Sequence, residues 1–251
     1  METQKNRVQL NRILVFTATY NEIENIENLL RSIREQLPQC DLLVVDDHSP
    51  DGTSDLIRKL QKTMPRLELI ERSGKLGLGT AHRLAFQYAA EHGYDGLITM
   101  DADFSHHPKY LPTMVKNLEK SEFVIGSRYT RGGGCDYGLY RQVVSRTANL
   151  MARGLLGMQL KETTTAYRGY QKSLLARLDM SGVRSEGYGF FVESLYQIQK
   201  TTSQMTEFPI YFEDRRAGVS KVDVKELFRG VTTLLRLFKG RINKTTIKAN
   251  S

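Results

Sequence analysis

The sequence predicts an α/β fold in which a mostly parallel sheet is flanked by helices. Short apolar runs, typical of buried parallel strands, alternate with segments whose apolar residues recur at helical spacing. Such an alternation builds a parallel sheet covered by helices on both faces. The 251 residues, 40% hydrophobic and 25% charged, have ordinary globular proportions, which exclude a disordered chain and a disulfide-stabilised miniature.

The expected elements follow from these two patterns in chain order. In the first half, buried strands are predicted at residues 13–16, 42–45, 67–70, 97–100 and 123–125. Helices are predicted between them, at residues 26–37, 56–64 and 84–90. The second half predicts a helix over residues 141–156, a short strand near Tyr167, a helix over 190–199 and an edge strand over 208–212 that contains Pro209. Arg131 and the three glycines after it predict a mobile loop.

The net charge of +8 comes from the C-terminal end of the chain. Residues 1–214 carry equal numbers of basic and acidic side chains, whereas residues 215–251 carry ten Lys and Arg against Asp223 and Glu226. A neutral body with a basic tail predicts an anionic partner at one end of the molecule. We therefore divide the chain into a globular domain over residues 1–222 and a basic C-terminal helix and tail over residues 223–251.

That C-terminal helix is predicted to be amphipathic. Its apolar residues fall on one helical face and are Leu227, Phe228, Val231, Leu234, Leu235 and Phe238. Such a face either packs on the domain or lies in a membrane interface, and the concentration of basic residues favours the membrane. No apolar run is long enough to span a bilayer, no secretory signal begins the chain, and Cys40 and Cys135 are expected to be free thiols. We expect a cytoplasmic protein.

Two acidic pairs follow predicted strands. Asp46-Asp47 ends the second strand and Asp101-x-Asp103 ends the fourth, and ligands of parallel sheets bind beyond these carboxyl ends. Helix capping is the alternative, and it accounts well for Asp51 in the turn that follows. Two carboxylates leaving one strand repel each other unless a cation lies between them, so a Mg²⁺ or Mn²⁺ site is favoured at Asp101 and Asp103.

A glycine-rich segment at residues 74–79 opens the third predicted helix. It could cradle a phosphate at the helix N-terminus. It has neither the G-x-G-x-x-G spacing nor the Gly-Lys-Ser/Thr ending of the established phosphate loops. By itself it predicts a tight turn against the sheet.

Six motifs in order give the sequence a resemblance to a known family. They lie at residues 18–22 (ATYNE), 45–53 (VDDHSPDGT), 74–79 (GKLGLG), 100–108 (MDADFSHHP), 126–129 (GSRY) and 141–149 (RQVVSRTAN). From about Ile13 to Lys221 the chain resembles the dolichol-phosphate, or polyprenol-phosphate, mannose synthases. These are inverting family-two glycosyltransferases of the Rossmann-like GT-A fold, so the resemblance implies a GT-A domain over residues 1–222.

The resemblance implies a role for each matching residue. The nucleotide sugar would be bound by Ala18, Tyr20, Glu22, Val45, Asp47, Asp101, Ala102, Asp103, Arg128, Arg215 and Lys221. The Mg²⁺ or Mn²⁺ ion would be held by Asp101, Asp103 and Ser105, with Ser105 standing where some relatives carry a longer Gln. The acceptor phosphate would be bound by Arg128, Arg141 and Ser145. The residues expected to carry catalysis are Asp101, Asp103 and Arg128.

The implied reaction is the inverting, metal-assisted transfer of mannose from GDP-mannose to a polyprenyl (dolichyl) monophosphate. The enzyme would be peripheral on the cytoplasmic face of a membrane, and some relatives depend on a partner subunit as anchor. Open alternatives are UDP-glucose or another nucleotide sugar as donor, and a non-catalytic nucleotide-sugar-binding subunit. A nucleic-acid partner is not expected, because the basic tail lacks interleaved aromatic residues.

Two departures from the family pattern stand out. Ala18 replaces a common Pro, and residues 162–168 read ETTTAYR where relatives commonly have Asp-x-Thr-Ser-Gly-aromatic-Arg. Glu162 and Ala166 therefore differ from the family on what is expected to be the acceptor side.

Overall fold

The computed structural model describes residues 7–136, 138–185, 187, 189–213, 230 and 232–241, with Tyr140 and Arg141 described by backbone alone. Its main sheet has seven strands. They are β1 (Ile13–Thr19), β2 (Asp41–Asp46), β3 (Leu67–Glu71), β4 (Gly96–Asp101), β5 (Phe123–Ser127), β7 (Arg168–Gln171) and β8 (Met205–Pro209). A small second sheet pairs β6 (Gly134–Cys135) with β9 (Tyr211–Phe212).

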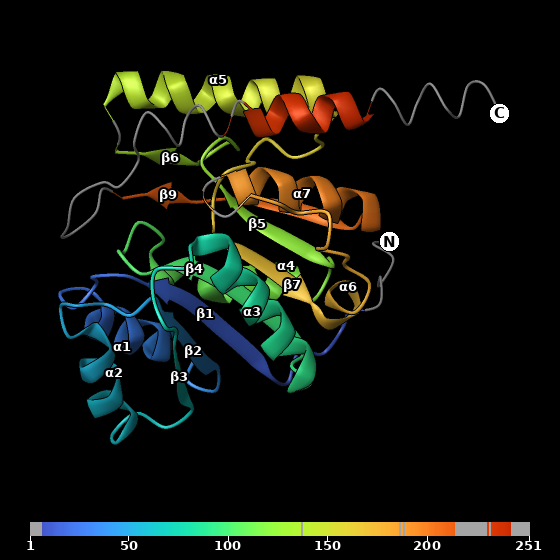
Figure 1. Cartoon of the computed structure of the whole chain (residues 1–251). Coiled ribbons are helices and arrows are strands. Elements are labelled where there is room, and N and C mark those ends of the chain that lie inside the picture. Colours follow the sequence, from blue (N-terminus) through green and yellow to red (C-terminus); the bar gives the residue numbers. More distant parts are fainter. Residues whose placement is uncertain are drawn as a thin grey trace.

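Helices connect most of these strands (Figure 1). They are α1 (Ile26–Gln36), α2 (Thr53–Gln61), α3 (Leu78–Glu91), α4 (Leu111–Leu118), α5 (Leu139–Leu156), α6 (Lys172–Leu175) and α7 (Gly189–Thr201), with a 3₁₀ turn at Pro108–Tyr110. Residues 232–241 are also helical. The strands and helices predicted in the first half of the chain are thus confirmed.

The strand order of the main sheet is β3-β2-β1-β4-β7-β5-β8. All pairings are parallel except those of β7, which runs antiparallel between β4 and β5. The chain first winds outward from β1 to β3 and then crosses to β4 on the other side of β1. In such sheets, ligands bind at the carboxyl ends beside this change of direction.

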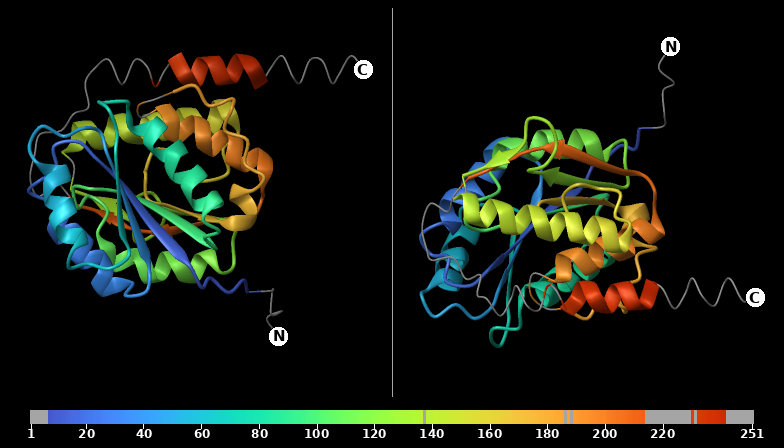
Figure 2. Two further views of the ribbon diagram at one scale, coloured as in Figure 1. Left: turned by 60° about the horizontal axis from the view of Figure 1, so that its bottom comes forward. Right: turned by 90° about the horizontal axis from the view of Figure 1, so that it is seen from above.

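Each face of the sheet carries its own hydrophobic core, because side chains alternate along a strand. Leu14 and Phe16 belong to the core that α3, α5, α6 and α7 cover. Val15, between them, belongs to the core under α1, α2 and α4. Figure 2 shows α3 lying across the first face. The predicted arrangement of helices on both faces is confirmed.

Two segments of the second half differ from the expectation. The strand expected over residues 208–212 is two strands, because β8 ends at Pro209 on the edge of the main sheet while β9 pairs with β6. The edge position of Pro209 is as predicted, since a proline has no N–H to donate. At the glycine run, a Cβ on Gly133 would lie 2.5 Å from the carbonyl oxygen of Ser127. Glycine is therefore needed there for close backbone packing, a constraint that the expectation of a mobile loop did not include.

The C-terminal helix packs on the domain through part of its apolar face. Leu234 is 5% exposed and belongs to the first core, and Phe238 packs against that core, while Leu235 is 48% exposed. The Arg241 guanidinium donates to the carbonyl oxygen of Leu155 in α5, and the two helices lie together in Figure 1. Leu227, Phe228 and Val231, and the domain boundary expected at residue 222, lie outside the described residues. At Leu234 and Phe238 the helix is thus a packing element of the domain.

Candidate active site

The carboxyl ends of three neighbouring strands bring predicted site residues into one row. Ala18 of β1 is paired with Val45 of β2 on one side and with Asp101 of β4 on the other. Tyr20 and Glu22 follow β1, and Asp47 follows β2. Ala102, Asp103 and Ser105 follow β4, and Arg128 follows β5. Residues that are far apart in the sequence are therefore placed at a single edge of the sheet, where the sequence predicted a site.

The two acidic residues at the end of β2, Asp46 and Asp47, make different contacts. Asp46 is fully buried, and its carboxylate accepts hydrogen bonds from the hydroxyls of Thr19, Ser49 and Ser54 at 2.6 to 2.8 Å. The backbone N–H of Ser49 also donates to it over 2.8 Å. Asp46 therefore organises the turn after β2.

Asp47 connects this turn to the glycine-rich segment. Its Oδ2 accepts the backbone N–H of Gly77 over 3.1 Å, and its carboxylate is paired with Arg72. Arg72 also donates to the carbonyl oxygen of Gly77 and to the hydroxyl of Thr80. Gly77 has φ of 92°, a conformation that favours glycine. Arg72 thus connects the glycine-rich segment to Asp47, the carboxylate that is predicted to bind the nucleotide. The sequence alone did not identify this arginine.

The first motif forms a second wall of the site. The ammonium group of Lys75, in the glycine-rich segment, lies 4.2 Å from the centroid of the Tyr20 ring. Glu22 is fixed through its backbone N–H, which donates to Thr53, and through its carboxylate, which accepts from Asn25. The Lys75 position places a cation beside the aromatic ring that was expected to contact the nucleoside.

Asp101 and Asp103 have carboxylates of different exposure. The Asp101 side chain is 33% exposed, whereas Asp103 is 4% exposed and accepts the backbone N–H of Ser105 over 3.0 Å. Among the described residues, no group of three or more His, Cys, Asp or Glu is placed to hold a metal ion. Two carboxylates fit Mg²⁺ or Mn²⁺ nonetheless, because such ions are commonly held by one or two carboxylates together with substrate phosphates.

His106 supports this acidic motif from behind. Its buried ring stacks on Tyr167, and its Nε2 lies 2.8 Å from the hydroxyl oxygen of Thr165. Burial lowers the pKa of His106 to about 3, so the imidazole is neutral at physiological pH. His107 instead accepts the backbone N–H of Lys109 and caps the 3₁₀ turn. Both histidines therefore hold the loop after β4.

Arg128 forms a buried ion pair with Glu162. The guanidinium donates from Nε and Nη2 to the two carboxylate oxygens over 2.8 and 2.9 Å, and Nη2 also donates to the hydroxyl of Thr164. Burial alone would raise the pKa of the Glu162 carboxyl. The positive charge of Arg128 and the hydrogen bonds from Arg128 and Thr164 outweigh burial and hold this pKa below its usual value. The residue expected to bind phosphate thus has an ionised carboxylate as its partner.

The residues expected to bind the acceptor phosphate are only partly described. The hydroxyl of Ser145 in α5 lies 2.6 Å from the hydroxyl of Tyr129, which adjoins Arg128. Arg141 lies one helical turn earlier in α5, with only its backbone described. Arg215 and Lys221 lie outside the described residues. Of the predicted phosphate ligands, the structure therefore places Arg128 and Ser145 near one another through Tyr129.

Three residues make contacts in the candidate site that the sequence did not predict. They are Arg72, His106 and Glu162. Glu162 was visible in the sequence as a departure from the family pattern. Arg72 had no signal of its own, because a single arginine after a strand resembles a solvated surface residue. His106 was visible three residues after Asp103, but its hydrogen bond with the backbone of Asp101 was not.

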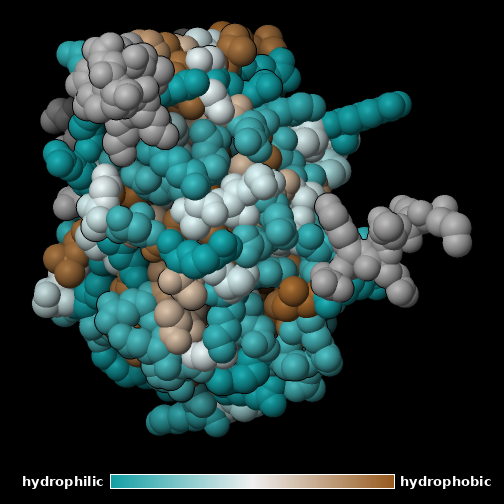
Figure 3. Space-filling model, turned by 90° about the vertical axis from the view of Figure 1, so that its right-hand side faces the viewer, coloured by the Kyte–Doolittle hydropathy of each residue, from teal (hydrophilic) through white to brown (hydrophobic). Residues whose placement is uncertain are grey.

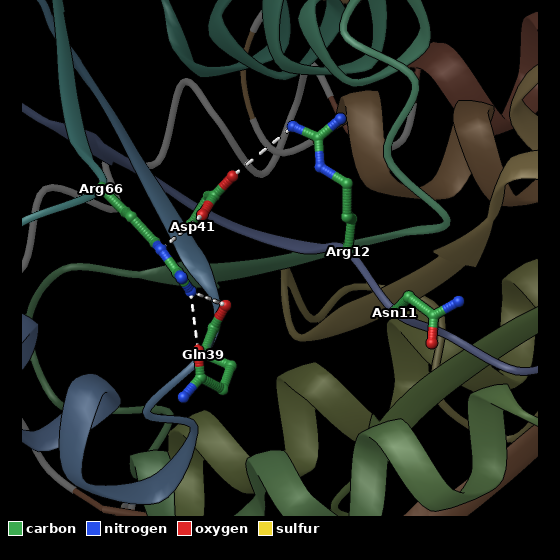
Figure 4. Close-up of a pocket in the computed structure, with 5 residues that line it drawn as sticks. All are labelled: Asn11, Arg12, Gln39, Asp41 and Arg66. Atoms are coloured by element: carbon green, nitrogen blue, oxygen red, sulfur yellow. Dashed lines mark hydrogen bonds and ion pairs between the residues drawn. The ribbon is translucent and has the colours of Figure 1, made fainter.

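A cavity of about 380 Å³ lies elsewhere on the sheet. It is lined by Asn11, Arg12, Gln39, Asp41 and Arg66, and the two arginines approach the Asp41 carboxylate (Figure 4). These residues precede or begin β1, β2 and β3, so the cavity is at the amino ends of the strands. It is on the edge of the sheet opposite to the candidate site.

Comparison with known proteins identifies the family of the chain. Residues 14–179 match the family described as Glycosyl transferase family 2. The chain is 37% identical over 212 residues to an undecaprenyl-phosphate mannosyltransferase of Micrococcus luteus, an alignment that covers 84% of this chain and 87% of the relative. It is 38% identical over 214 residues to a polyprenol monophosphomannose synthase of Mycolicibacterium smegmatis, with 84% and 81% covered.

Solved structures share the fold at lower sequence identity. A glucosyl-3-phosphoglycerate synthase from Mycobacterium tuberculosis has a TM-score of 0.62 at 20% identity, with 91% of this chain and 80% of that chain covered. A mannosyltransferase from Pyrobaculum calidifontis, solved with GDP-Man and Mn²⁺, has a TM-score of 0.60 at 21% identity, with 96% and 68% covered. The fold is the GT-A fold of these glycosyltransferases.

Proposed function

We propose a specific reaction for this chain, which belongs to glycosyl transferase family 2 and is a glycosyltransferase. The reaction is the transfer of mannose from GDP-mannose to a polyprenyl monophosphate, with inversion at the anomeric carbon. The names of two relatives that are 37% and 38% identical over most of both chains support the sugar and the lipid acceptor. The GDP-Man bound to a mannosyltransferase of the same fold supports the donor.

The observation that carries this proposal is the row formed by Val45, Ala18 and Asp101. It places the residues expected to bind the nucleoside directly beside the acidic motif expected to bind the diphosphate. Tyr20 and Asp47 flank the row, and Arg128 leaves the same edge of the sheet from β5. A nucleotide sugar lying along this edge would therefore direct its anomeric carbon toward Arg128 and the neighbouring Tyr129–Ser145 contact.

The chemistry asks the protein mainly to position two anionic substrates. A phosphate monoester has a second pKa near ~6, so the acceptor is an anionic nucleophile at neutral pH without a general base. A divalent ion held by Asp101 and Asp103 would supply charge compensation for the leaving nucleotide diphosphate. Arg128 and Ser145, with Arg141 in the same helix, would orient the acceptor phosphate for in-line attack. Arg215 and Lys221 are proposed to neutralise further phosphate charge.

Membrane contact is proposed through α5. Leu139, Val143 and Leu150 are 82%, 62% and 68% exposed, and they share one helical face with the exposed Arg146 and Arg153. Apolar side chains interspersed with arginines suit an interface with anionic lipid. Figure 3 shows hydrophobic residues along the upper edge of the molecule, where α5 and residues 232–241 lie.

The helix that carries this apolar surface also carries Ser145 and Arg141, which are proposed to bind the acceptor phosphate. In the C-terminal helix Leu235 is exposed, whereas Leu234 and Phe238 pack on the core. No helix among the described residues is long and apolar enough to cross a bilayer. We place the enzyme peripherally on the cytoplasmic face of a membrane, where a lipid phosphate can reach Arg128, with a partner subunit as a further means of anchoring.

The test is transfer of labelled sugar to lipid. Purified protein is incubated with labelled GDP-mannose, Mg²⁺ or Mn²⁺, and vesicles that contain undecaprenyl or dolichyl phosphate. The expected result is a labelled product that partitions into chloroform and disappears when the lipid phosphate is omitted. Parallel reactions with UDP-glucose test the donor. A folded protein that binds GDP-mannose but forms no lipid product with either donor would identify a nucleotide-sugar-binding subunit and overturn the proposal.

A further inference from the structure

We infer that Glu162 is a positioning residue, which orients the guanidinium of Arg128 for the phosphate chemistry of the site; the inference rests on the proposed function. The two side chains meet in a fork, with Nε donating to Oε2 over 2.8 Å and Nη2 donating to Oε1 over 2.9 Å. Two parallel hydrogen bonds fix both the plane and the distance of a guanidinium, which a single bond cannot do.

Glu162 is itself held rigidly. Its side chain is 0% exposed, and the carboxylate oxygen Oε1 also accepts the backbone N–H and the hydroxyl of Thr164, both over 3.0 Å. The backbone N–H groups of Lys161 and Glu162 both donate to the carboxylate of Glu207 in β8, each over 2.8 Å. The carboxylate that orients Arg128 is thus anchored to the main sheet and has little freedom to move.

Aromatic rings complete the orientation of Arg128. The guanidinium carbon lies 5.3 Å from the centroid of the Phe212 ring and 5.2 Å from that of Tyr129. The Tyr129 hydroxyl in turn lies 2.6 Å from that of Ser145. Glu162, Arg128, Tyr129 and Ser145 therefore form one continuous chain of contacts, from the segment before β7 to the helix that carries the proposed acceptor residues.

Stability alone does not account for this pair. A buried ion pair loses the hydration of both charges, and apolar side chains of similar size are often at least as stabilising. Glu162 also offsets the positive charge of Arg128, which is proposed to bind phosphate, and this by itself weakens the attraction between Arg128 and an anionic substrate. What the carboxylate supplies is a fixed direction for the guanidinium at the edge of the sheet, and that direction matters for positioning an attacking phosphate.

Two substitutions of Glu162 separate the effect of its carboxylate on the orientation of Arg128 from the effect of its side-chain size. In Glu162→Gln the shape is kept, but one acceptor becomes an N–H donor that faces the donors of Arg128, so the fork is broken. We expect kcat for mannosyl transfer to fall by roughly 10- to 100-fold, with KM for GDP-mannose within about two-fold of wild type. Glu162→Asp keeps both carboxylate oxygens, and we expect it to retain activity within about ten-fold.

The matched control is Glu193→Gln. Glu193 in α7 is also 0% exposed, and it accepts hydrogen bonds from Arg236 and from the backbone of Arg184 and Ser185, none of which belongs to the proposed site. It should lower the thermal midpoint comparably and leave kcat unchanged. In an Arg128→Ala background, Glu162→Gln should cause no additional loss of kcat, because Glu162 acts through Arg128.

The outcomes distinguish the inference from the proposed function. Absence of lipid product with the wild-type enzyme would contradict the proposed function. With an active wild type, equal kcat in Glu162→Gln, or a further loss in the Arg128→Ala background, would overturn the role of Glu162 alone. Should Glu162→Gln not fold, Thr164→Val decides: it removes the hydroxyl that contacts both partners without unbalancing a charge. A kcat about three- to ten-fold lower supports the inference, and an unchanged kcat overturns it.

Discussion

The backbone nitrogen of Asp101 lies 3.1 Å from Nδ1 of His106 and donates its hydrogen to it. Since a backbone N–H can only donate, Nδ1 carries no proton, and the single proton of the neutral ring is on Nε2. From there it is donated to the hydroxyl oxygen of Thr165 over 2.8 Å. The histidine therefore fixes the backbone at the end of β4, where the proposed metal-binding motif begins.

Replacing His106 should disturb this motif. His106→Phe keeps a flat ring against Tyr167 but leaves the N–H of Asp101 and the hydroxyl of Thr165 without their partner. We expect a loss of about 1–3 kcal/mol in the free energy of unfolding and a reduced kcat. Denaturant unfolding and transfer assays measure both. His107→Phe is the control, since it keeps a ring at this position and removes the 3₁₀ cap, and an equal effect on kcat would contradict the assignment.

The acidic motif should be required for turnover. Asp101→Ala and Asp103→Ala remove one carboxylate each from the proposed metal site, and we expect kcat to fall by more than about 100-fold. Asp101 is the last residue of β4 and Asp103 lies in the loop after it, so circular dichroism should show a retained fold. Asp55→Ala, on the exposed side of α2, should keep full activity. Wild-type turnover that continues in excess EDTA would argue against a metal.

Stability should depend on pH through His82. The ring is buried among Phe16, Phe190 and Phe191, and burial lowers its pKa to about 3. Because the unfolded chain binds the proton near about pH 6.5 and the folded chain does not, stability is present above that pH and is lost as the pH falls toward 3.

The unfolding free energy lost through His82 between neutral pH and about pH 5 amounts to roughly 2 kcal/mol. His82→Leu should therefore show a shallower fall in unfolding free energy between about pH 6.5 and 4 than wild type. His48→Gln is the control, because its side chain is 67% exposed. Identical pH profiles for His82→Leu and wild type would rule out this contribution.

The glycine-rich segment should tolerate substitution at one end only. A Cβ on Gly79 would lie 2.9 Å from both the Phe190 ring and the carbonyl oxygen of Ser185, whereas nothing lies within 4 Å of a Cβ on Gly74. Gly79→Ala should therefore cost about 1–3 kcal/mol of stability, and Gly74→Ala should be close to neutral. Thermal denaturation of both variants compares them, and equal midpoints would refute the close packing of α3.

Lipid binding should depend on the exposed face of α5. A variant with Leu139, Val143 and Leu150 changed to Ser should lose most co-sedimentation with anionic vesicles, because it removes the apolar contact while keeping the arginines. Binding by the wild type should weaken with salt. Val8→Ser, a change at an exposed apolar residue far from α5 in the sequence, should bind as wild type. Undiminished binding by the triple variant would exclude this face.

The sequence predicted the sheet, both helix layers and the edge of the sheet at which the candidate site residues lie together. Buried strands appear as short apolar runs, and in amphipathic helices the apolar residues recur about every 3.6 residues. Both patterns can be recognised within a window of about a dozen residues. The acidic motifs were legible because they follow those strands directly. The antiparallel β7 and the separation of β8 from β9 were not, since strand direction and pairing depend on contacts between distant segments.

What the sequence by itself determined, then, is which residues lie at the carboxyl ends of the strands; what the tertiary structure decided is the partner of each. Asp46 and Asp47 are neighbours in the sequence, yet one is enclosed by hydroxyls and the other is paired with Arg72. Arg128 and Glu162 are 34 residues apart, and their two hydrogen bonds form because β5 pairs with β7, which brings the segment before β7 to the end of β5. Local pattern fixes an element and its exposed end, whereas the burial and pairing of a charge depend on which other segments the whole fold brings against it.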